Sequence, residues 1–401
     1  MSQNFDAIFS KSAMRMKKSE IRECLKLTQR PGMISFAGGL PAPDTFPIEE
    51  LRKISDEVLK NDGESALQYS KTEGDDKLRD LLTERYQKMG LKITRNNLII
   101  VTSSQQSLDF LGRIFIDDGD EIICELPSYS GALGAFRCYG AKMTGILSDE
   151  SGMRADILDS VLASMMRENR KPKFIYTIPD FQNPAGITMP ESRRKEVVDI
   201  ARKYGVLIVE DSPYRELRFS GVPQKTIHEI DGGENVITIG TFSKIFVPGF
   251  RTGWIIAPEA IIDKFVTAKQ SADLCTASFV QKITAKYMEL GFFDRNLLDI
   301  VVKYGEKKDI MLEGLRKYMP EGVSWTEPDG GLFLFLTLPP QMNADELFYK
   351  AVEKNVAFIK GSVFHCDGSG HNTMRLNFSY CTKEENIEGI KRLAEVIREN
   401  L

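Results

Sequence analysis

The chain has 401 residues, of which 42% are hydrophobic and 27% are charged, and its formal net charge is −4. A chain of this length can form one large and one smaller compact unit. The charge balance argues against the basic surface that binds nucleic acid or anionic membrane, and no apolar run approaches the ~20 residues of a membrane span.

The N-terminal region is polar at first and then rich in proline and glycine. Residues 1–27 lack the apolar core of a signal peptide, so we expect a cytoplasmic protein. Residues 31–47 (PGMISFAGGLPAPDTFP) are expected to form an extended connection into a large domain. Six scattered cysteines without a CxxC pair are typical of reduced thiols, and the three histidines have no metal-ligand spacing, so we expect no metal site.

The middle of the chain alternates between short apolar runs and amphipathic stretches. The apolar runs that we predict to be buried strands lie at residues 97–104, 120–129, 173–184, 205–214, 235–244 and 253–258. Helical periodicity is found between them, for example at 107–116 and 191–205. This alternation predicts an α/β fold with a mostly parallel sheet that is covered by helices.

The final third has a different pattern. A long helix is predicted at 299–319, extended segments at 322–339 and 373–380, and a closing helix at 385–400. Residues 344–361 are expected to belong to the same unit. We therefore expect a smaller α+β domain at the C-terminal end.

Four of the predicted strands end in polar residues. The apolar part of the first is followed by residues 102–106 (TSSQQ), that of the third by 180–184 (DFQNP), that of the fourth by Asp211 and that of the fifth by residues 241–244 (TFSK). Each group alone has a simple structural explanation, such as a helix N-cap or a surface lysine. Because ligands of open parallel sheets bind at the carboxyl ends of the strands, the four groups together predict one shared site.

Three stretches around these residues resemble a known family. They are PDFQNPAG (179–186), EDSPYREL (210–217) and TFSKIFVPGFRTGW (241–254), and in this order they resemble the class I, fold-type I aminotransferases that use pyridoxal 5′-phosphate (PLP). The similarity covers nearly the whole chain. Residues 21–47, 66–74 and 102–109 look most like the branch of bacterial 2-aminoadipate and kynurenine/aminoadipate aminotransferases.

The resemblance implies the PLP-dependent transferase fold, with a mostly parallel seven-stranded-type sheet. It assigns residues 1–44 to an N-terminal arm and small-domain segment, 45–290 to the large PLP-binding domain, and 291–401 to the C-terminal small domain. It also implies a homodimer with shared active sites.

The same resemblance gives roles to five residues around the cofactor ring. Lys244 would bond covalently to the cofactor aldehyde and then act as the base at the substrate Cα. Asp211 would pair with the pyridine nitrogen, while Asn183 and Tyr214 would hydrogen-bond the ring oxygen. Tyr129 would stack on the ring face.

The phosphate of the cofactor would be held by hydroxyl, amide and guanidinium groups. The residues implied are Ser104, Gln105, Thr241, Ser243 and Arg251, together with Tyr69 of the partner subunit.

For the substrate, the resemblance implies an amino group moving between an L-amino acid and a 2-oxo acid such as 2-oxoglutarate. The amino acid would be 2-aminoadipate, glutamate, or one of aromatic or branched-chain type. Arg375 would bind its α-carboxylate with help from Asn183, Arg22 would recognise an acidic side chain, and Gly39 would leave room for it. Asp180 departs from the branch, and facing the pocket it would disfavour acidic substrates.

Three alternatives stay open. A PLP-dependent carbon–sulfur lyase would share the same Lys, Asp and Arg set. A non-catalytic PLP-binding sensor domain would need a DNA-binding module, for which the N-terminal segment looks too short. A nicotinamide-dependent enzyme is disfavoured because no GxGxxG follows a predicted strand.

Overall fold

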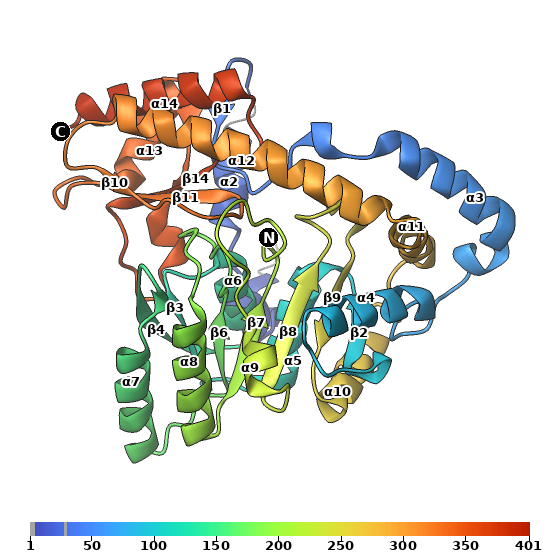
Figure 1. Cartoon of the computed structure of the whole chain (residues 1–401). Coiled ribbons are helices and arrows are strands. Elements are labelled where there is room, and N and C mark those ends of the chain that lie inside the picture. The colour runs from blue at the N-terminus through green and yellow to red at the C-terminus, as the bar shows by residue number, and fades with distance from the viewer. Residues whose placement is uncertain (1–4, 28–29) are drawn as a thin grey trace.

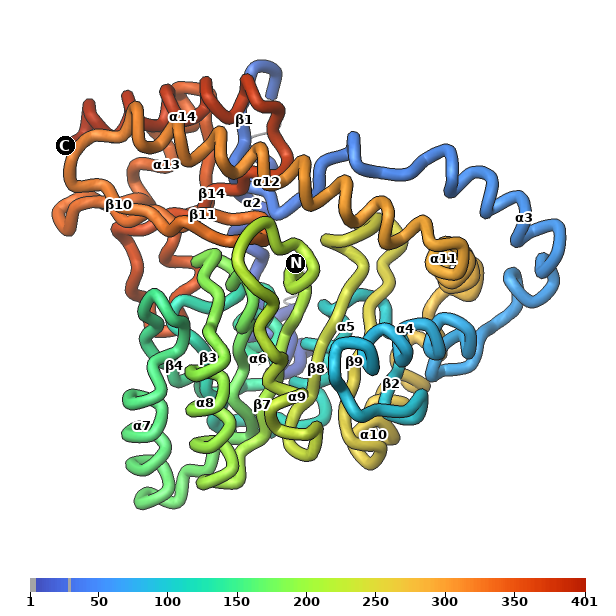
Figure 2. Tube along the Cα trace, in the orientation of Figure 1, coloured from blue at the N-terminus to red at the C-terminus, as the bar shows by residue number. Residues whose placement is uncertain are grey.

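The computed structural model describes residues 5–27 and 30–401 (Figures 1 and 2). Within them, one large sheet has eight strands in the order β2-β9-β8-β7-β6-β3-β4-β5. The strands are β2 (Leu98–Val101), β3 (Glu121–Leu126), β4 (Lys142–Asp149), β5 (Gly152–Met153), β6 (Phe174–Thr177), β7 (Leu207–Asp211), β8 (Val236–Thr241) and β9 (Gly253–Ile256).

The strand directions confirm a mostly parallel sheet. The neighbours β4, β3, β6, β7 and β8 run parallel, while β9 is antiparallel to both β8 and β2. All six apolar runs contain a strand, although each strand is shorter than the run. The sequence analysis missed β4 and the two-residue β5, because β4 is a largely half-buried strand without a long apolar run.

Helices cover both faces of this sheet, which is why β2, β6, β8 and β9 are buried at every residue. The helices of this part are α3 (Ile48–Leu67), α4 (Asp76–Lys88), α5 (Ser103–Phe115), α6 (Ser130–Cys138), α7 (Ala155–Arg167), α8 (Glu191–Tyr204), α9 (Ile227–Asp231), α10 (Glu259–Gln270) and α11 (Ser278–Glu289). Helices α7, α8 and α9 pack in one row, and α5 packs against α6 and α10. Figure 1 shows the first row in front of the sheet, with α5 and α6 behind it.

Helix α8 illustrates how the sequence determines one of these elements. Its buried positions include Val197, Val198 and Ala201, which form one apolar stripe at helical spacing. The helix stops at Gly205, whose φ of +62° is a left-handed conformation that glycine adopts without strain. The chain can therefore turn directly into β7.

The C-terminal part forms a second, smaller unit above the carboxyl ends of the large sheet (Figure 1). Its elements are α12 (Phe292–Tyr318), β10 (Ser324–Trp325), β11 (Phe333–Thr337), α13 (Ala344–Glu353), β12 (Val356–Ala357), β13 (Ile359–Lys360), β14 (Thr373–Asn377) and α14 (Lys383–Arg398). The strand order of its sheet is β10-β11-β14-β13. The expected α+β unit is thus confirmed, and the predicted helix at 299–319 begins seven residues earlier, at Phe292.

The N-terminal segment joins this second unit. It contains α1 (Lys11–Arg15), α2 (Glu20–Leu27) and β1 (Ile34–Ser35), together with the short 3₁₀ turns η1 (Phe5–Ile8) and η2 (Pro43–Thr45). Three further 3₁₀ turns of the described chain lie elsewhere, namely η3 (Arg95–Asn97), η4 (Pro248–Phe250) and η5 (Gly361–Phe364). Strand β1 pairs in parallel with β12, and the backbone N–H of Asn377 donates to the carbonyl of Phe36. The proline-rich stretch is therefore largely extended, as expected. Among the described helices, none is long and apolar enough to cross a membrane.

Candidate active site

The carboxyl ends of the central strands carry most of the predicted site residues. Asp211 is the last residue of β7, and Lys244 lies three residues after the end of β8. Asn183 lies on the loop after β6, and Ser104 and Gln105 lie in the first turn of α5, which follows β2. In Figure 1 the arrow of β8 points toward the second unit, so that unit closes the site from above.

Asp211 is almost fully buried, and among the described residues only one of its two carboxylate oxygens has a hydrogen-bond partner. The Tyr176 hydroxyl donates a hydrogen bond to its Oδ2 at 2.7 Å, whereas its Oδ1 has no partner in the described structure. Burial raises the pKa of Asp211 to about 7, and the hydrogen bond from Tyr176 opposes that rise. A buried carboxylate oxygen without a partner is costly, so this atom points to a missing donor.

Lys244 lies inside the same region. Its Nζ donates to the backbone carbonyl of Gly39 at 2.7 Å. Burial lowers the pKa of Lys244 to about 8, and the positive charges of Arg375 and Arg251 lower it further. At neutral pH the neutral fraction of this amine is therefore far larger than that of an ordinary surface lysine.

Asn183 connects Tyr214 with Arg375. Its Nδ2 donates to the Tyr214 hydroxyl oxygen at 3.2 Å, and its Oδ1 accepts from the Arg375 guanidinium at 2.8 Å. Because the Tyr214 oxygen already accepts a hydrogen bond, its own proton remains available for a ligand oxygen. The register of β14 against β11 brings Arg375 to this point from 192 residues further along the chain.

The Arg375 guanidinium is held on several sides. A second nitrogen donates to the carbonyl of Ala37 at 2.9 Å, and the Nε has no partner. The group lies 4.1 Å from the ring centroid of Phe333 and 5.0 Å from that of Phe364. Burial lowers the pKa of Arg375 to about 10, and the group stays charged at neutral pH.

The start of α5 faces the loop after β8. The Arg251 guanidinium donates to the Ser103 hydroxyl at 2.5 Å and to the Ser243 hydroxyl at 3.5 Å. Ser103 and Arg251 both have positive φ, at 66° and 50°, in the region that non-glycine residues rarely adopt. Strained residues of this kind concentrate at ligand sites.

Further contacts hold the polar groups around the start of α5 and the loop after β8. Thr241 donates to the Ser243 hydroxyl at 3.0 Å, and its oxygen accepts from the Ser243 backbone N–H at 3.1 Å. A Cβ atom on Gly253 would lie 2.9 Å from the backbone nitrogen of Ser104, so only glycine lets β9 approach the start of α5 this closely. The exposed Gln105 side chain bonds the carbonyl of Gly131 at 3.3 Å.

Tyr129 lies within reach of several of these charges. Burial raises its pKa, the negative charge of Asp211 raises it further, and the positive charges of Arg375, Arg251 and Arg22 lower it. Its ring occupies the space in which a side chain at residue 131 would clash, and that residue is a glycine.

Two predicted residues are exposed in the single chain. Arg22, on α2, is exposed, and within residues 5–27 and 30–401 no hydrogen bond or ion pair holds its guanidinium. Its positive charge nevertheless lowers the pKa of Tyr129. Tyr69, just after α3, is 77% exposed, so it contributes to no site in its own chain.

Asp180 does not face Lys244 or Arg375. It is buried against Arg194, with two hydrogen bonds of 2.8 and 3.2 Å, and against Arg215 at 3.1 Å. These ion pairs lower the pKa of Asp180 despite burial. The expectation that this carboxylate disfavours acidic substrates therefore has no support in the geometry.

The arrangement fits a cofactor with a ring nitrogen, an aldehyde and a phosphate. The unpartnered Oδ1 of Asp211 suits a protonated pyridine nitrogen, and the amine of Lys244, with its lowered pKa, suits an aldehyde. The hydroxyls of Ser103 and Ser243 with Arg251, next to the free N–H groups of a helix start, suit a phosphate. Together these atoms offer a partner to each of the three groups of PLP.

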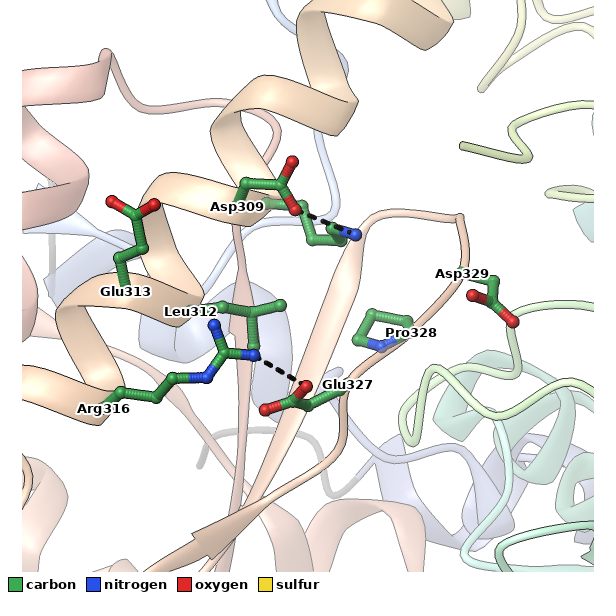
Figure 3. A pocket seen from close by; sticks show the side chains of 8 residues that line it. Asp309, Leu312, Glu313, Arg316, Glu327, Pro328 and Asp329 are labelled. Carbon is green, nitrogen blue, oxygen red and sulfur yellow. Dashed lines mark hydrogen bonds and ion pairs between the residues drawn. The ribbon is translucent and has the colours of Figure 1, made fainter. Parts of the chain in front are cut away.

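A cavity of about 320 Å³ lies elsewhere, between α12 and the connection from β10 to β11 (Figure 3). Four acidic and two basic side chains line it, and two ion pairs close it partly, Lys308–Asp309 at 3.0 Å and Arg316–Glu327 at 2.7 Å. None of the predicted site residues lines this cavity.

Sequence reasoning missed several residues of the site. Tyr176 reads as an ordinary strand residue, and Phe333 and Phe364 read as core. Ser103 was treated only as part of a helix start. The polar hydroxyl of Tyr176, directly after the apolar Phe174 and Ile175 in a buried strand, is the available signal.

Comparisons with known proteins agree with this site. Residues 32–393 match the family model for aminotransferase class I and II. The aromatic-amino-acid aminotransferase 1 of Thermococcus litoralis is 46% identical over 399 residues, which cover 99% of this chain and 96% of that protein.

Two solved structures are similar over almost their whole length. The kynurenine aminotransferase of Pyrococcus horikoshii, in complex with PMP, is 43% identical with a TM-score of 0.96, and the match covers 99% of this chain and 98% of that one. The α-aminoadipate aminotransferase of Thermus thermophilus, complexed with N-(5′-phosphopyridoxyl)-L-leucine, is 37% identical with a TM-score of 0.92 and 99% coverage of both chains.

Proposed function

The chain belongs to the class I and II aminotransferases, and we propose that this PLP-dependent enzyme uses both acidic and aromatic L-amino acids, with 2-oxoglutarate as the common acceptor. The observation that carries the proposal is the surroundings of Arg375. The buried guanidinium lies over the rings of Phe333 and Phe364, and the exposed Arg22 adds a second positive charge. These apolar surroundings suit an aromatic side chain, and Arg22 suits a carboxylate.

Arg375 binds the α-carboxylate in this proposal. Its Nε is buried without a partner, and a carboxylate oxygen would satisfy it. Asn183 fixes the guanidinium, so the clamp is oriented before substrate arrives. Gly39 supports the same placement, because a Cβ there would lie 3.3 Å from the Phe333 ring and 3.9 Å from the Lys244 Nζ, in the space left for substrate.

Lys244 holds the cofactor and moves the proton at the substrate Cα. When bound, PLP supplies an electron-accepting ring that stabilises negative charge at that carbon. Lys244 would take the Cα proton in its neutral form, which burial and two neighbouring arginines favour by lowering the pKa of its amine. Asp211 would hold a proton at the ring nitrogen through its free Oδ1, and Tyr214 would donate its proton to the ring oxygen. Tyr129 would cover one face of the ring.

The phosphate of the cofactor would bind to groups around the start of α5. Ser104 and Gln105 offer backbone N–H groups there, and Arg251 and Ser243 offer a guanidinium and a hydroxyl. Thr241 orients Ser243 through a hydrogen bond of 3.0 Å.

A panel of amino donors tests the substrate proposal. Purified enzyme is incubated with 2-oxoglutarate and either 2-aminoadipate, phenylalanine, kynurenine or leucine, and glutamate formation is measured. Comparable kcat/KM values for the acidic and aromatic donors support the proposal, and activity with one class alone refutes it. Release of pyruvate from cystathionine without glutamate formation would instead favour the carbon–sulfur lyase.

The proposal includes a homodimer with shared sites. Large apolar side chains are exposed on two helices that both pack on α11, namely on α3 at Ile48, Leu59 and Leu67 and on α12 at Leu298 and Val302. Tyr69 lies just after α3 and, being exposed, is available to the phosphate of a partner.

Mixing two variants tests this arrangement. We expect Tyr69→Ala and Lys244→Ala to be weakly active or inactive alone. If Tyr69 serves the partner subunit, a mixed dimer contains one intact site, so mixing after partial dissociation restores activity. A mixture without recovery, or a monomer in size-exclusion chromatography, contradicts the shared site.

Two further assignments belong to the proposal. We assign residues 1–44 to an N-terminal arm and small-domain segment, 45–290 to the large domain and 291–401 to the C-terminal small domain, and the pairing of β1 with β12 supports this. We also place the enzyme in the cytoplasm. All six cysteines are free, including Cys124 and Cys366, whose sulfur atoms lie 3.8 Å apart, which supports a reducing compartment.

A further inference from the structure

Tyr176 is a fully buried tyrosine whose hydroxyl reaches the cofactor-facing carboxylate. It lies on β6 opposite Val209 of the parallel strand β7, and its side chain extends past that position to Asp211 at the end of β7. The hydroxyl donates to Asp211 Oδ2 at 2.7 Å. The other oxygen of the carboxylate, Oδ1, has no partner within the described chain.

Packing alone does not require a tyrosine at this position. The ring packs edge-on against Phe136, with centroids 5.6 Å apart and an interplanar angle of 76°, and phenylalanine would fill the same space. A hydroxyl in an apolar interior is costly unless it is hydrogen-bonded. The use of this hydroxyl in the structure is therefore its bond to Asp211.

Among the residues that the structure describes, the ionisable groups around Asp211 include no cation that would stabilise its negative charge, so the hydrogen bond from Tyr176 matters for that charge. The ionisable groups that interact with Asp211 are the acidic Glu125 of β3 and the phenols of Tyr129, Tyr176 and Tyr214. Burial favours the protonated form of Asp211, and within the described chain the Tyr176 hydrogen bond is the interaction that opposes it.

We propose that Tyr176 is a positioning residue that acts through Asp211: it fixes the carboxylate by Oδ2 and so aims Oδ1 at the proton on the cofactor ring nitrogen. This inference rests on the proposed placement of the ring nitrogen at Asp211. Tyr176 itself touches neither substrate nor cofactor in this arrangement. Without its hydroxyl, Asp211 is free to rotate and takes up the shared proton more readily.

The test compares Tyr176→Phe with Tyr139→Phe. Tyr139 is a matched control, because its hydroxyl also donates to an aspartate, Asp109 Oδ1 at 3.1 Å, outside the site. The apo-proteins are titrated with PLP, and the holoenzymes are prepared with cofactor labelled with ¹⁵N at the ring nitrogen. We expect Tyr176→Phe to weaken PLP binding by about ten- to a hundredfold, as for one hydrogen bond to a charged group.

The ring-nitrogen signal and the kinetics give independent readouts. In Tyr176→Phe the ¹⁵N signal moves toward that of an unprotonated nitrogen, and kcat falls while KM for the amino donor stays near the wild-type value. Tyr139→Phe leaves all three measurements unchanged. Wild-type values for Tyr176→Phe overturn the inference.

A double-mutant cycle separates positioning from a merely structural role. In an Asp211→Asn background, Tyr176→Phe causes no further loss of PLP affinity if Tyr176 acts through Asp211, whereas additive losses overturn the inference. The cycle uses variants that differ by single polar atoms and keep the packing. A wild-type protein that binds no PLP, or whose ring nitrogen is unprotonated, refutes instead the proposed cofactor placement.

Discussion

Replacement of Arg375 by lysine keeps the positive charge and removes the guanidinium fork. In the structure the fork is fixed by Asn183 Oδ1 at 2.8 Å and the Ala37 carbonyl at 2.9 Å, which leaves Nε for a ligand. A lysine ammonium is a single point of donation that cannot reach these acceptors and also present a second donor to a carboxylate. We therefore expect Arg375→Lys to lower kcat/KM for every amino acid substrate.

The magnitude follows from the contacts. One hydrogen bond to a charged group is worth about 1.5–3 kcal/mol, so losing one of two bonds to the α-carboxylate lowers kcat/KM by about 10- to 150-fold. The factor should be the same for acidic, aromatic and aliphatic donors, because all of them carry the α-carboxylate.

The assay measures kcat/KM for 2-aminoadipate, phenylalanine and leucine with 2-oxoglutarate. Arg316→Lys is the control, because Arg316 forms an ion pair of 2.7 Å with Glu327 in the separate cavity of Figure 3. We expect the control to behave as wild type. An unchanged kcat/KM in Arg375→Lys, or a loss restricted to acidic donors, would refute the assigned role.

Four further outcomes are expected. The rate of PLP uptake by the apo-protein, followed by absorbance, should rise with pH up to about 8 and then level off, because burial lowers the pKa of Lys244 to about 8; a rise that continues to pH 10 contradicts this. Burial raises the pKa of Asp211 from 3.8 to about 7, so folding increasingly disfavours its ionised form as the pH rises from 4 to 7. Asp211→Asn should therefore stabilise the apo-protein above pH 7, by up to about 4 kcal/mol in urea unfolding, while it weakens PLP binding. Asp180→Asn should lose about 3–5 kcal/mol of stability, because it leaves Arg194 without its ion-pair partner in the interior. The ratio of activity with acidic donors to activity with aromatic donors should stay the same; a changed ratio would show that Asp180 acts on the substrate. Arg22→Ala should raise KM for 2-aminoadipate about tenfold and leave phenylalanine unaffected, and equal effects on both would remove its assigned role.

The sequence could predict those parts of the site that depend on short-range order. Asp211 is the last residue of one strand and Lys244 lies three residues after the end of the next, and parallel strands bring their carboxyl ends to one edge. The strands themselves were found because they are buried on both faces and so read as continuous apolar runs. The half-buried edge strand β4 lacks that pattern and was missed.

The remaining features depend on register and on distant segments. The bond from Tyr176 to Asp211 requires the alignment of β6 with β7, which no local pattern reveals. Asp180 lies on an irregular loop, where side chains do not alternate between faces, and its partners Arg194 and Arg215 come from 14 and 35 residues further along. The orientation of its carboxylate could be read only from the folded chain.

The most direct test of the account is to locate the covalently bound cofactor. Holoenzyme is reduced with borohydride, digested, and its peptides are mapped by mass spectrometry, with Lys269→Arg as a control for another buried lysine. The account predicts one phosphopyridoxyl group per chain, on Lys244, in the wild type and in the control. A modified lysine elsewhere, or a wild-type protein that carries no PLP after incubation with it, would contradict the central claim.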